Sequence, residues 1–137
     1  MRSTKHSMFL GLGLALGALL SSGCVVAAGA GVGYLISQEV LPNEVHSAQV
    51  KDDAEHVYDV AKETLGFMIE PNTEIIAASS PRSATGTVDG ATVNVTVEAY
   101  DLDRTIVNVE ADRPLRRDGT TAAEVLNAIL DRLDRQN

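Results

Sequence analysis

The side chains of this sequence that could do chemistry are few and lie in short clusters. Its single cysteine, Cys24, lies in an apolar, glycine-rich stretch near the amino terminus, so no internal disulfide can form. His56 follows Asp52 by four residues and precedes Asp59 by three, so a helix would place these three side chains on one exposed arc. A metal site needs more ligands than this arc supplies, and a solvated helix face is the favoured interpretation.

Acidic residues at a predicted hairpin form the second cluster. Asp101 and Asp103, with Asp89 nearby, could offer oxygen ligands to a calcium ion. Calcium takes six or more oxygens, usually in a glycine-shaped loop that the segment DLDR lacks, so we interpret these acids as polar hairpin residues. The sequence has no GxSxG or SxxK nucleophile motif and no phosphate-binding glycine loop after a strand. We therefore expect no enzyme, no catalytic residue, no metal and no cofactor.

Three arginines form the one concentrated basic patch of an acidic chain. Arg113, Arg116 and Arg117 lie close together, whereas the whole chain has a formal net charge of −8. The simplest interpretation is a solvated loop before the last helix. The alternative is a contact with lipid phosphates or with a carboxylate-rich envelope partner, because guanidinium groups bind such anions through paired hydrogen bonds. The negative net charge argues against nucleic acid as a partner, since phosphate neutralisation needs a basic face.

Residues 1–23 have the three parts of a secretory signal peptide. Arg2 and Lys5 give a positive start, an apolar stretch covers residues 8–20, and small residues precede Cys24. This apolar stretch spans ~20 Å as a helix, which is short of the ~30 Å thickness of a bilayer core. By itself it is a poor membrane anchor.

The segment from Leu20 to Cys24 resembles the lipobox of bacterial lipoproteins. Ser22, Gly23 and Cys24 are in register with that motif, while Ser21 stands where the family prefers leucine. The resemblance implies that the Cys24 thiol becomes a diacylglyceryl thioether and that the chain is cut before it. Because two or three acyl chains anchor a protein stably, membrane attachment would follow. Val25, and not aspartate, follows the cysteine, which by the same resemblance implies the outer membrane, facing the periplasm.

Two other interpretations of this region stay open. Residues 8–36 form one uncharged stretch that is long enough for an uncleaved membrane helix. Cleavage after Ala30 would instead release a soluble protein. With lipidation, residues 24–42 form a glycine-rich apolar tether, in which the Gly29 and Gly33 spacing also fits a close helix pair. Tyr34 suits either the membrane interface or a core.

Residues 43–137 are expected to form one small folded domain. Alternation predicts a strand over residues 44–50. Asp52 and Glu55 have the spacing of a capping box at the start of a helix that ends near Gly66. Strands are predicted over these ranges: 73–80, 85–88, 91–100 and 104–112.

The final segments predict a hairpin and a second helix. Asp89-Gly90 is typical of a two-residue hairpin turn. Thr121 and Glu124 form another capping box before an apolar stripe that ends at Leu133. These elements predict an α+β fold in the order β-α-β-β-β-α, with one antiparallel sheet of about four strands and two helices on one face.

The whole chain resembles a family of small bacterial lipoproteins known only as a domain of unknown function. The likeness rests on the lipobox, the tract AAGAGVGY, the helix VYDVAKETL, the hairpin ATGTVDGATVNVTVEAYD and the last helix EVLNAILDRL. It implies location and shape but no activity. We expect a lipid-anchored envelope protein that is a structural or interaction module. The alternative is a module that binds a lipid or cell-wall-derived ligand between sheet and helices, with space left by Ala77, Ala99 or Ala111.

Overall fold

The computed structural model describes residues 34–137, and the structural statements below concern this part of the chain. The predicted signal peptide, the lipidation site Cys24 and the tether up to residue 33 lie outside the described residues. The elements follow in the order β1 (Leu35–Leu41), the 3-10 turn η1 (Pro42–Glu44), β2 (Val45–Val50), α1 (Ala54–Met68), β3 (Ile76–Ser79), β4 (Arg82–Val88), β5 (Ala91–Ala99), β6 (Thr105–Arg113), β7 (Arg116–Arg117) and α2 (Gly119–Gln136).

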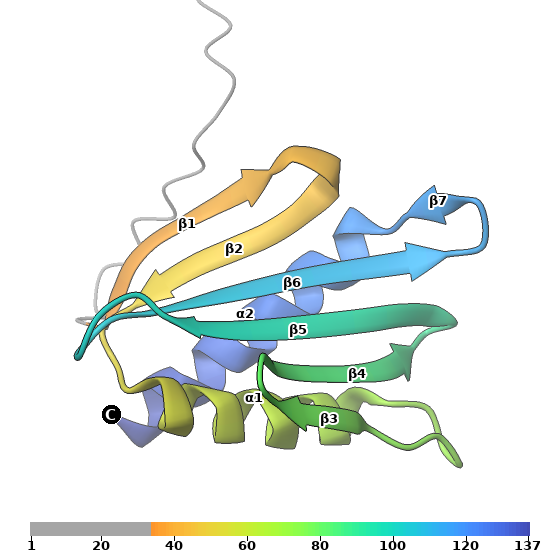
Figure 1. Cartoon of the computed structure of the whole chain (residues 1–137). Helices are drawn as coiled ribbons and strands as arrows, with labels where there is room; N and C mark the ends of the chain where they lie inside the picture. Colours follow the sequence, from red (N-terminus) through yellow and green to blue (C-terminus); the bar gives the residue numbers. More distant parts are fainter. Residues whose placement is uncertain (1–33) are drawn as a thin grey trace, which may run out of the picture.

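The fold is α+β, as predicted, with two helices on one side of an antiparallel sheet (Figure 1). The number of strands was wrong, because the sheet has seven strands and not about four. The strands lie in the order β1-β2-β6-β5-β4-β3, and β7 pairs with the end of β6. The predicted element order had one strand before the first helix and three between the helices, whereas the structure has two before α1 and five between α1 and α2.

Two local features explain why β1 and β7 were missed. The apolar residues of β1 come in adjacent pairs, Leu35-Ile36 and Val40-Leu41, and do not alternate. A register shift at the start of β1 also interrupts its pairing with β2. β7 is only two residues long, which is too short for any periodic pattern. β1 comes from the range predicted as tether, 24–42, so the last part of that range belongs to the sheet.

The alternating strands build the core. Val93, Val95 and Val97 of β5 are buried, and so are Val107 and Val109 of β6. Their side chains lie on the face that the helices cover, because successive residues of a strand point to opposite faces. The helices contribute these fully buried residues: Val57, Ala61 and Leu65 from α1, and Val125, Leu126, Ile129 and Leu133 from α2.

The helix boundaries differ from the predicted ones. Asp53, and not Asp52, caps α1, because its carboxylate accepts hydrogen bonds from the backbone N–H groups of Glu55 and His56. Asp118, and not Thr121, caps α2, and the Thr121 backbone N–H donates to it. The predicted end of this helix near Gly66 is early, because α1 continues to Met68. Gly66 is an exposed residue within the helix and does not end it.

The predicted turn Asp89-Gly90 joins β4 and β5. Both residues have positive φ, 48° and 74°, as the tight hairpin turn requires. The prediction of a strand over 73–80 was too long, since β3 covers only four residues, all exposed at the edge of the sheet.

The sheet has two ends, which we call the near end and the far end. At the near end β1 begins, and the register runs across neighbouring strands from Leu35 to Val50, Thr105 and Ala99. The loop between β5 and β6 extends beyond that line. At the far end lie the turns β1–β2 and β6–β7 and the start of α2. Figure 1 has the near end at the left and the far end at the right.

Candidate functional site

A groove of about 610 Å³ opens at the far end, between the β1–β2 hairpin, β7 and the start of α2. Its volume is in the range of small-molecule pockets. The lining residues are Val40, Glu44, His46, Arg116, Arg117, Asp118, Gly119, Thr120 and Ala123. The three contributing regions are distant in sequence, so only the folded sheet brings them together.

Two tight turns shape the groove. Asn43 and Glu44 in the β1–β2 turn have φ values of 65° and 59°, and Leu115 in the β6–β7 turn has 72°. Such positive φ values are uncommon for residues other than glycine and persist where surrounding contacts hold them. One such contact is the Glu44 carboxylate, which accepts a hydrogen bond of 3.0 Å from the Gly119 backbone N–H. It ties the hairpin to the first turn of α2.

The three arginines of the predicted basic patch have different surroundings. Arg113 is ion-paired with Asp118. Arg117 lies 3.3 Å from a Glu110 carboxylate oxygen and 3.0 Å from one of Asp112. Within residues 34–137, Arg116 has no hydrogen bond or ion pair from its side chain. The patch is thus one free guanidinium beside two that are neutralised inside the domain.

Asp118 is the most strongly perturbed acid of the groove. Its carboxylate accepts hydrogen bonds from the Thr121 backbone N–H at 3.1 Å and from the Thr121 hydroxyl at 2.9 Å, and it pairs with Arg113. The Thr121 backbone hydrogen bond and the Arg113 guanidinium lower the pKa of Asp118 to about 2. The Asp118 carboxylate is therefore ionised at neutral pH, and its oxygens are already engaged by Thr121 and Arg113.

His46 and Val40 form the hairpin side of the groove. They are cross-strand partners in β1 and β2, so both side chains point to the same face, toward α2. His46 is half-buried, and its ring has no hydrogen bond to another described residue. Among the ionisable groups of the groove, His46 and Arg116 are the ones whose side chains make no hydrogen bond or ion pair within the described part of the chain.

The three side chains considered as metal ligands, Asp52, His56 and Asp59, do not converge on one point. The His56 ring donates to Asp52 over 2.9 Å and contacts Gln136 of α2 at 3.2 Å, while Asp59 pairs with Lys62. The hydrogen bond to Asp52 raises the pKa of His56 above its usual value, against the opposing effect of burial. In residues 34–137 no group of three or more histidine, cysteine or acidic side chains is arranged to hold a metal.

The acidic hairpin residues are also separated. Asp89 lies in the turn before β5, at the far end, whereas Asp101 and Asp103 lie in the loop after it, at the near end. The nine-residue strand β5 is ~30 Å long, so Asp89 cannot share a binding site with Asp101 and Asp103. Of the alanines considered for a pocket, Ala111 is buried in the core, and Ala77 and Ala99 are exposed.

Sequence reasoning found the arginines of this site but missed Glu44, His46 and Val40. The available signal was Pro42-Asn43, a turn pair between two strand-length runs, which the assignment of residues 24–42 to a tether obscured.

Comparison with known proteins adds no relative. No protein-family model and no curated protein matches this chain. None of the helices within residues 34–137 is both long enough and apolar enough to cross a membrane.

Proposed function

We propose that this protein is a lipid-anchored protein of the bacterial envelope, attached through Cys24 to the periplasmic face of the outer membrane. Its folded body would be a non-enzymatic interaction module that binds an envelope partner in the far-end groove. The observation that best supports this proposal is that the junction with the tether and the groove lie at opposite ends of the sheet. The chain joins the sheet at the near end, and the groove opens at the far end.

The length of the tether limits how far the near end can lie from the bilayer. Nine residues separate Cys24 from Tyr34. Fully extended, this segment reaches ~35 Å, so the near end stays within that distance of the lipid. The sheet adds ~30 Å between the near end and the groove. A partner in the periplasm can therefore reach the groove without contacting the bilayer.

The chemistry of the groove favours a partner that bears a carboxylate. Arg116 offers a guanidinium that no described acid engages, and guanidinium groups bind carboxylates through two parallel hydrogen bonds. Val40 and Ala123 supply apolar surface beside it. His46 adds a further donor or acceptor. A carboxylate-bearing peptide segment fits this combination of one cation and an apolar wall.

Attachment is tested by the intact mass of the protein extracted from membranes. A chain that begins at Cys24 and carries diacylglycerol, together with release of the Cys24→Ala variant from the membrane fraction, is the expected result. An unmodified chain that begins at Met1 or Gly31 would refute lipidation.

Partner binding is tested with a photo-crosslinking residue at Thr120 in the groove of the full-length protein in cells. We expect a crosslinked product that Arg116→Gln abolishes. Arg135→Gln is the matched control, because Arg135 is exposed in the last turn of α2, away from the groove, and its loss changes the net charge equally. Equal loss of crosslinking in both variants, or in neither, would contradict a role for the groove.

The size of the groove supports a second candidate, a module that binds a small carboxylate-bearing ligand from lipid or cell wall. In that case, denaturing the purified protein should release a small molecule that is detected by mass spectrometry. The Arg116→Gln protein should release much less of it than the Arg135→Gln protein does.

A further inference from the structure

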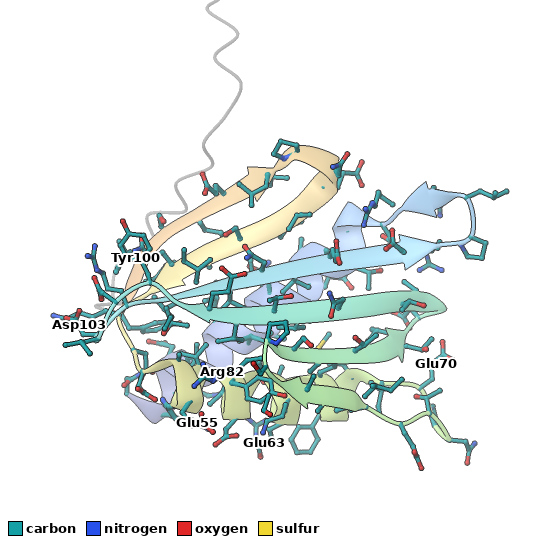
Figure 2. The ribbon with its side chains drawn as sticks, in the orientation of Figure 1. Glu55, Glu63, Glu70, Arg82, Tyr100 and Asp103 are labelled. Atoms are coloured by element: carbon teal, nitrogen blue, oxygen red, sulfur yellow. The ribbon has the colours of Figure 1, made fainter. Side chains whose placement is uncertain are left out.

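The loop between β5 and β6 presents the most exposed large apolar side chains of the near end. Leu102 is 99% exposed and Tyr100 is 59% exposed. Figure 2 shows both Tyr100 and Asp103 at that end of the sheet, with Asp103 at its outermost point. We call residues 100–104 the near tip.

The near tip is held in one shape by its own hydrogen bonds. The backbone N–H groups of Tyr100 and Asp101 donate to the Arg104 carbonyl oxygen at 2.8 and 3.2 Å. The Asp103 N–H donates to the Asp101 carboxylate at 3.2 Å. Because these polar groups have partners within the tip, it can leave water without breaking them.

The tip's charge is partly cancelled inside it. Arg104 is ion-paired with Asp101, and its guanidinium lies 4.7 Å from the centre of the Tyr100 ring. Asp103 has no ion pair among the described residues, so the tip has one net negative charge. An aromatic ring beside a long cationic side chain and an exposed leucine is the composition that collects at the headgroup level of a bilayer.

The near tip lies beside the point where the chain joins the sheet. Leu35 is linked by register through Val50 to Thr105, the first residue of β6 after the tip. Neighbouring strands are ~4.8 Å apart, so β1 and β6 are separated by ~10 Å. A chain from Cys24 that keeps the start of β1 within ~35 Å of the lipid therefore keeps the near tip within reach of the bilayer too.

We propose that the near tip is a membrane-contact site, in which Leu102 and Tyr100 enter the headgroup region of the bilayer that holds the Cys24 lipid. The proposal rests on the lipid anchor of the proposed function and adds the orientation of the body. The surface it fits is zwitterionic, because the tip and the neighbouring Asp52 and Asp53 are acidic overall, with Lys51 as the nearby cation. Anionic lipid should weaken the contact.

The far end supplies a matched control. Leu115 is also fully exposed at a hairpin tip, between β6 and β7. The sequence has no tryptophan, so Leu102→Trp and Leu115→Trp each create a chain with a single tryptophan, which can be excited apart from the tyrosines. Both changes add the same apolar bulk, and neither residue packs in the core.

The experiment uses the full, lipid-modified protein in vesicles of phosphatidylethanolamine and phosphatidylcholine, with bromine on some acyl chains as quencher. The fraction bound to vesicles and the mass at Cys24 are measured in the same sample. We expect quenching of the Leu102→Trp chain to be about twofold or more stronger than that of Leu115→Trp, since only the near tip meets lipid. A second change, Leu102→Asp in a Tyr100→Trp chain, should remove the quenching of that reporter.

The outcomes separate the two proposals. If the lipidated protein binds vesicles but lipid quenches neither the tryptophan at residue 102 nor the one at residue 115, the membrane contact is overturned. The lipid anchor would still stand. A chain that lacks lipid at Cys24 and stays in solution would overturn both the anchor and the contact. Quenching at Leu102→Trp that grows with anionic lipid would contradict the zwitterionic surface.

Discussion

Two hairpin tips at opposite ends of one sheet each present a fully exposed leucine, and their surroundings differ. Leu102 lies in a loop whose polar groups bind one another and whose arginine pairs with an acid inside the loop. Leu115 lies next to Arg116, whose donors no described side chain uses, beside a groove. The first tip engages three backbone N–H groups and its arginine internally but carries the Asp103 carboxylate, which has no ion pair among the described residues and stays in water. The second tip is followed by a guanidinium that no described side chain engages. An exposed leucine is thus informative only together with its neighbours.

Both ends depend on α2, so a core change in this helix should affect them together. Leu126 is fully buried, and Leu126→Ala should lower the free energy of unfolding by about 2–5 kcal/mol, through lost contacts and a cavity. Urea denaturation of the mature protein in detergent measures this. Leu115→Ala, as control, should change stability by no more than about 0.5 kcal/mol. Near-end protection from hydrogen exchange that survives Leu126→Ala would show that the two ends do not belong to one cooperative unit.

A smaller effect is expected where β1 is joined to α2 at the near end. Tyr34 is 8% exposed, and its hydroxyl donates to the Leu130 backbone carbonyl, so the ring belongs to the core and not to a membrane interface. Burial raises the pKa of Tyr34 to about 12, with the nearby Asp134 and Asp131 acting in the same direction. Tyr34→Phe should cost about 1 kcal/mol of stability, because the Leu130 carbonyl loses its donor.

Tyr100→Phe is the matched control for this change. The Tyr100 hydroxyl has no hydrogen bond to a described residue, so its removal should leave the melting temperature unchanged. Equal shifts in the two variants would contradict the difference between a buried tyrosine that links β1 to α2 and an exposed one at the near tip.

The smallest effects distinguish the two ends by pH. The pKa of His56, at the near end, is raised in the folded state chiefly by the hydrogen bond to Asp52. The contribution of protonated His56 to the stability of the fold is therefore complete below about pH 6.5 and is lost as pH rises through the folded pKa. The pKa of Asp118, at the far end, is lowered from 3.8 to about 2, so its stabilisation exists above 3.8 and is lost as pH falls through about 2.

Melting temperatures of His56→Gln and Asp118→Asn, each compared with the unchanged protein across pH, measure these two effects. The His56→Gln deficit should shrink as the solution becomes alkaline, and the Asp118→Asn deficit should shrink in strong acid. If the losses of melting temperature in the two variants changed in the same direction with pH, the assignment of a protonated His56 and an ionised Asp118 would be wrong.

The sequence predicted those parts of the fold in which local chemistry and tertiary packing agree. The alternation of Val93, Val95 and Val97 indicated a half-buried strand, and Asp89-Gly90 indicated its turn. Helix starts were displaced because two adjacent aspartates compete to cap α1, and Asp53 alone reaches the free N–H groups. Short-range patterns do not decide between such neighbours.

The groove could not be predicted in the same way. Glu44 and Gly119 are 75 residues apart, and their hydrogen bond exists only because β2 pairs with β6 and α2 returns beneath both. The arginine cluster was visible in the sequence, but the division into two paired guanidiniums and one free one depends on acids from β6 and from the start of α2. Long-range contacts of this kind leave no local periodicity.

The position of β1 also has a mechanical consequence. β1 is an edge strand that is hydrogen-bonded to β2 alone, and its first residue is at the near end. If Cys24 holds the chain in lipid, a pull on the body acts along the axis of β1. Antiparallel hydrogen bonds lie perpendicular to the strands, so this pull loads them in shear, all at once, and does not open them one after another. That load would fall first on two hydrogen bonds at the start of β1, from the Tyr34 hydroxyl to the Leu130 carbonyl and from the Lys51 N–H to the Tyr34 carbonyl. In that case β1 would pass the force from the anchor into the folded body.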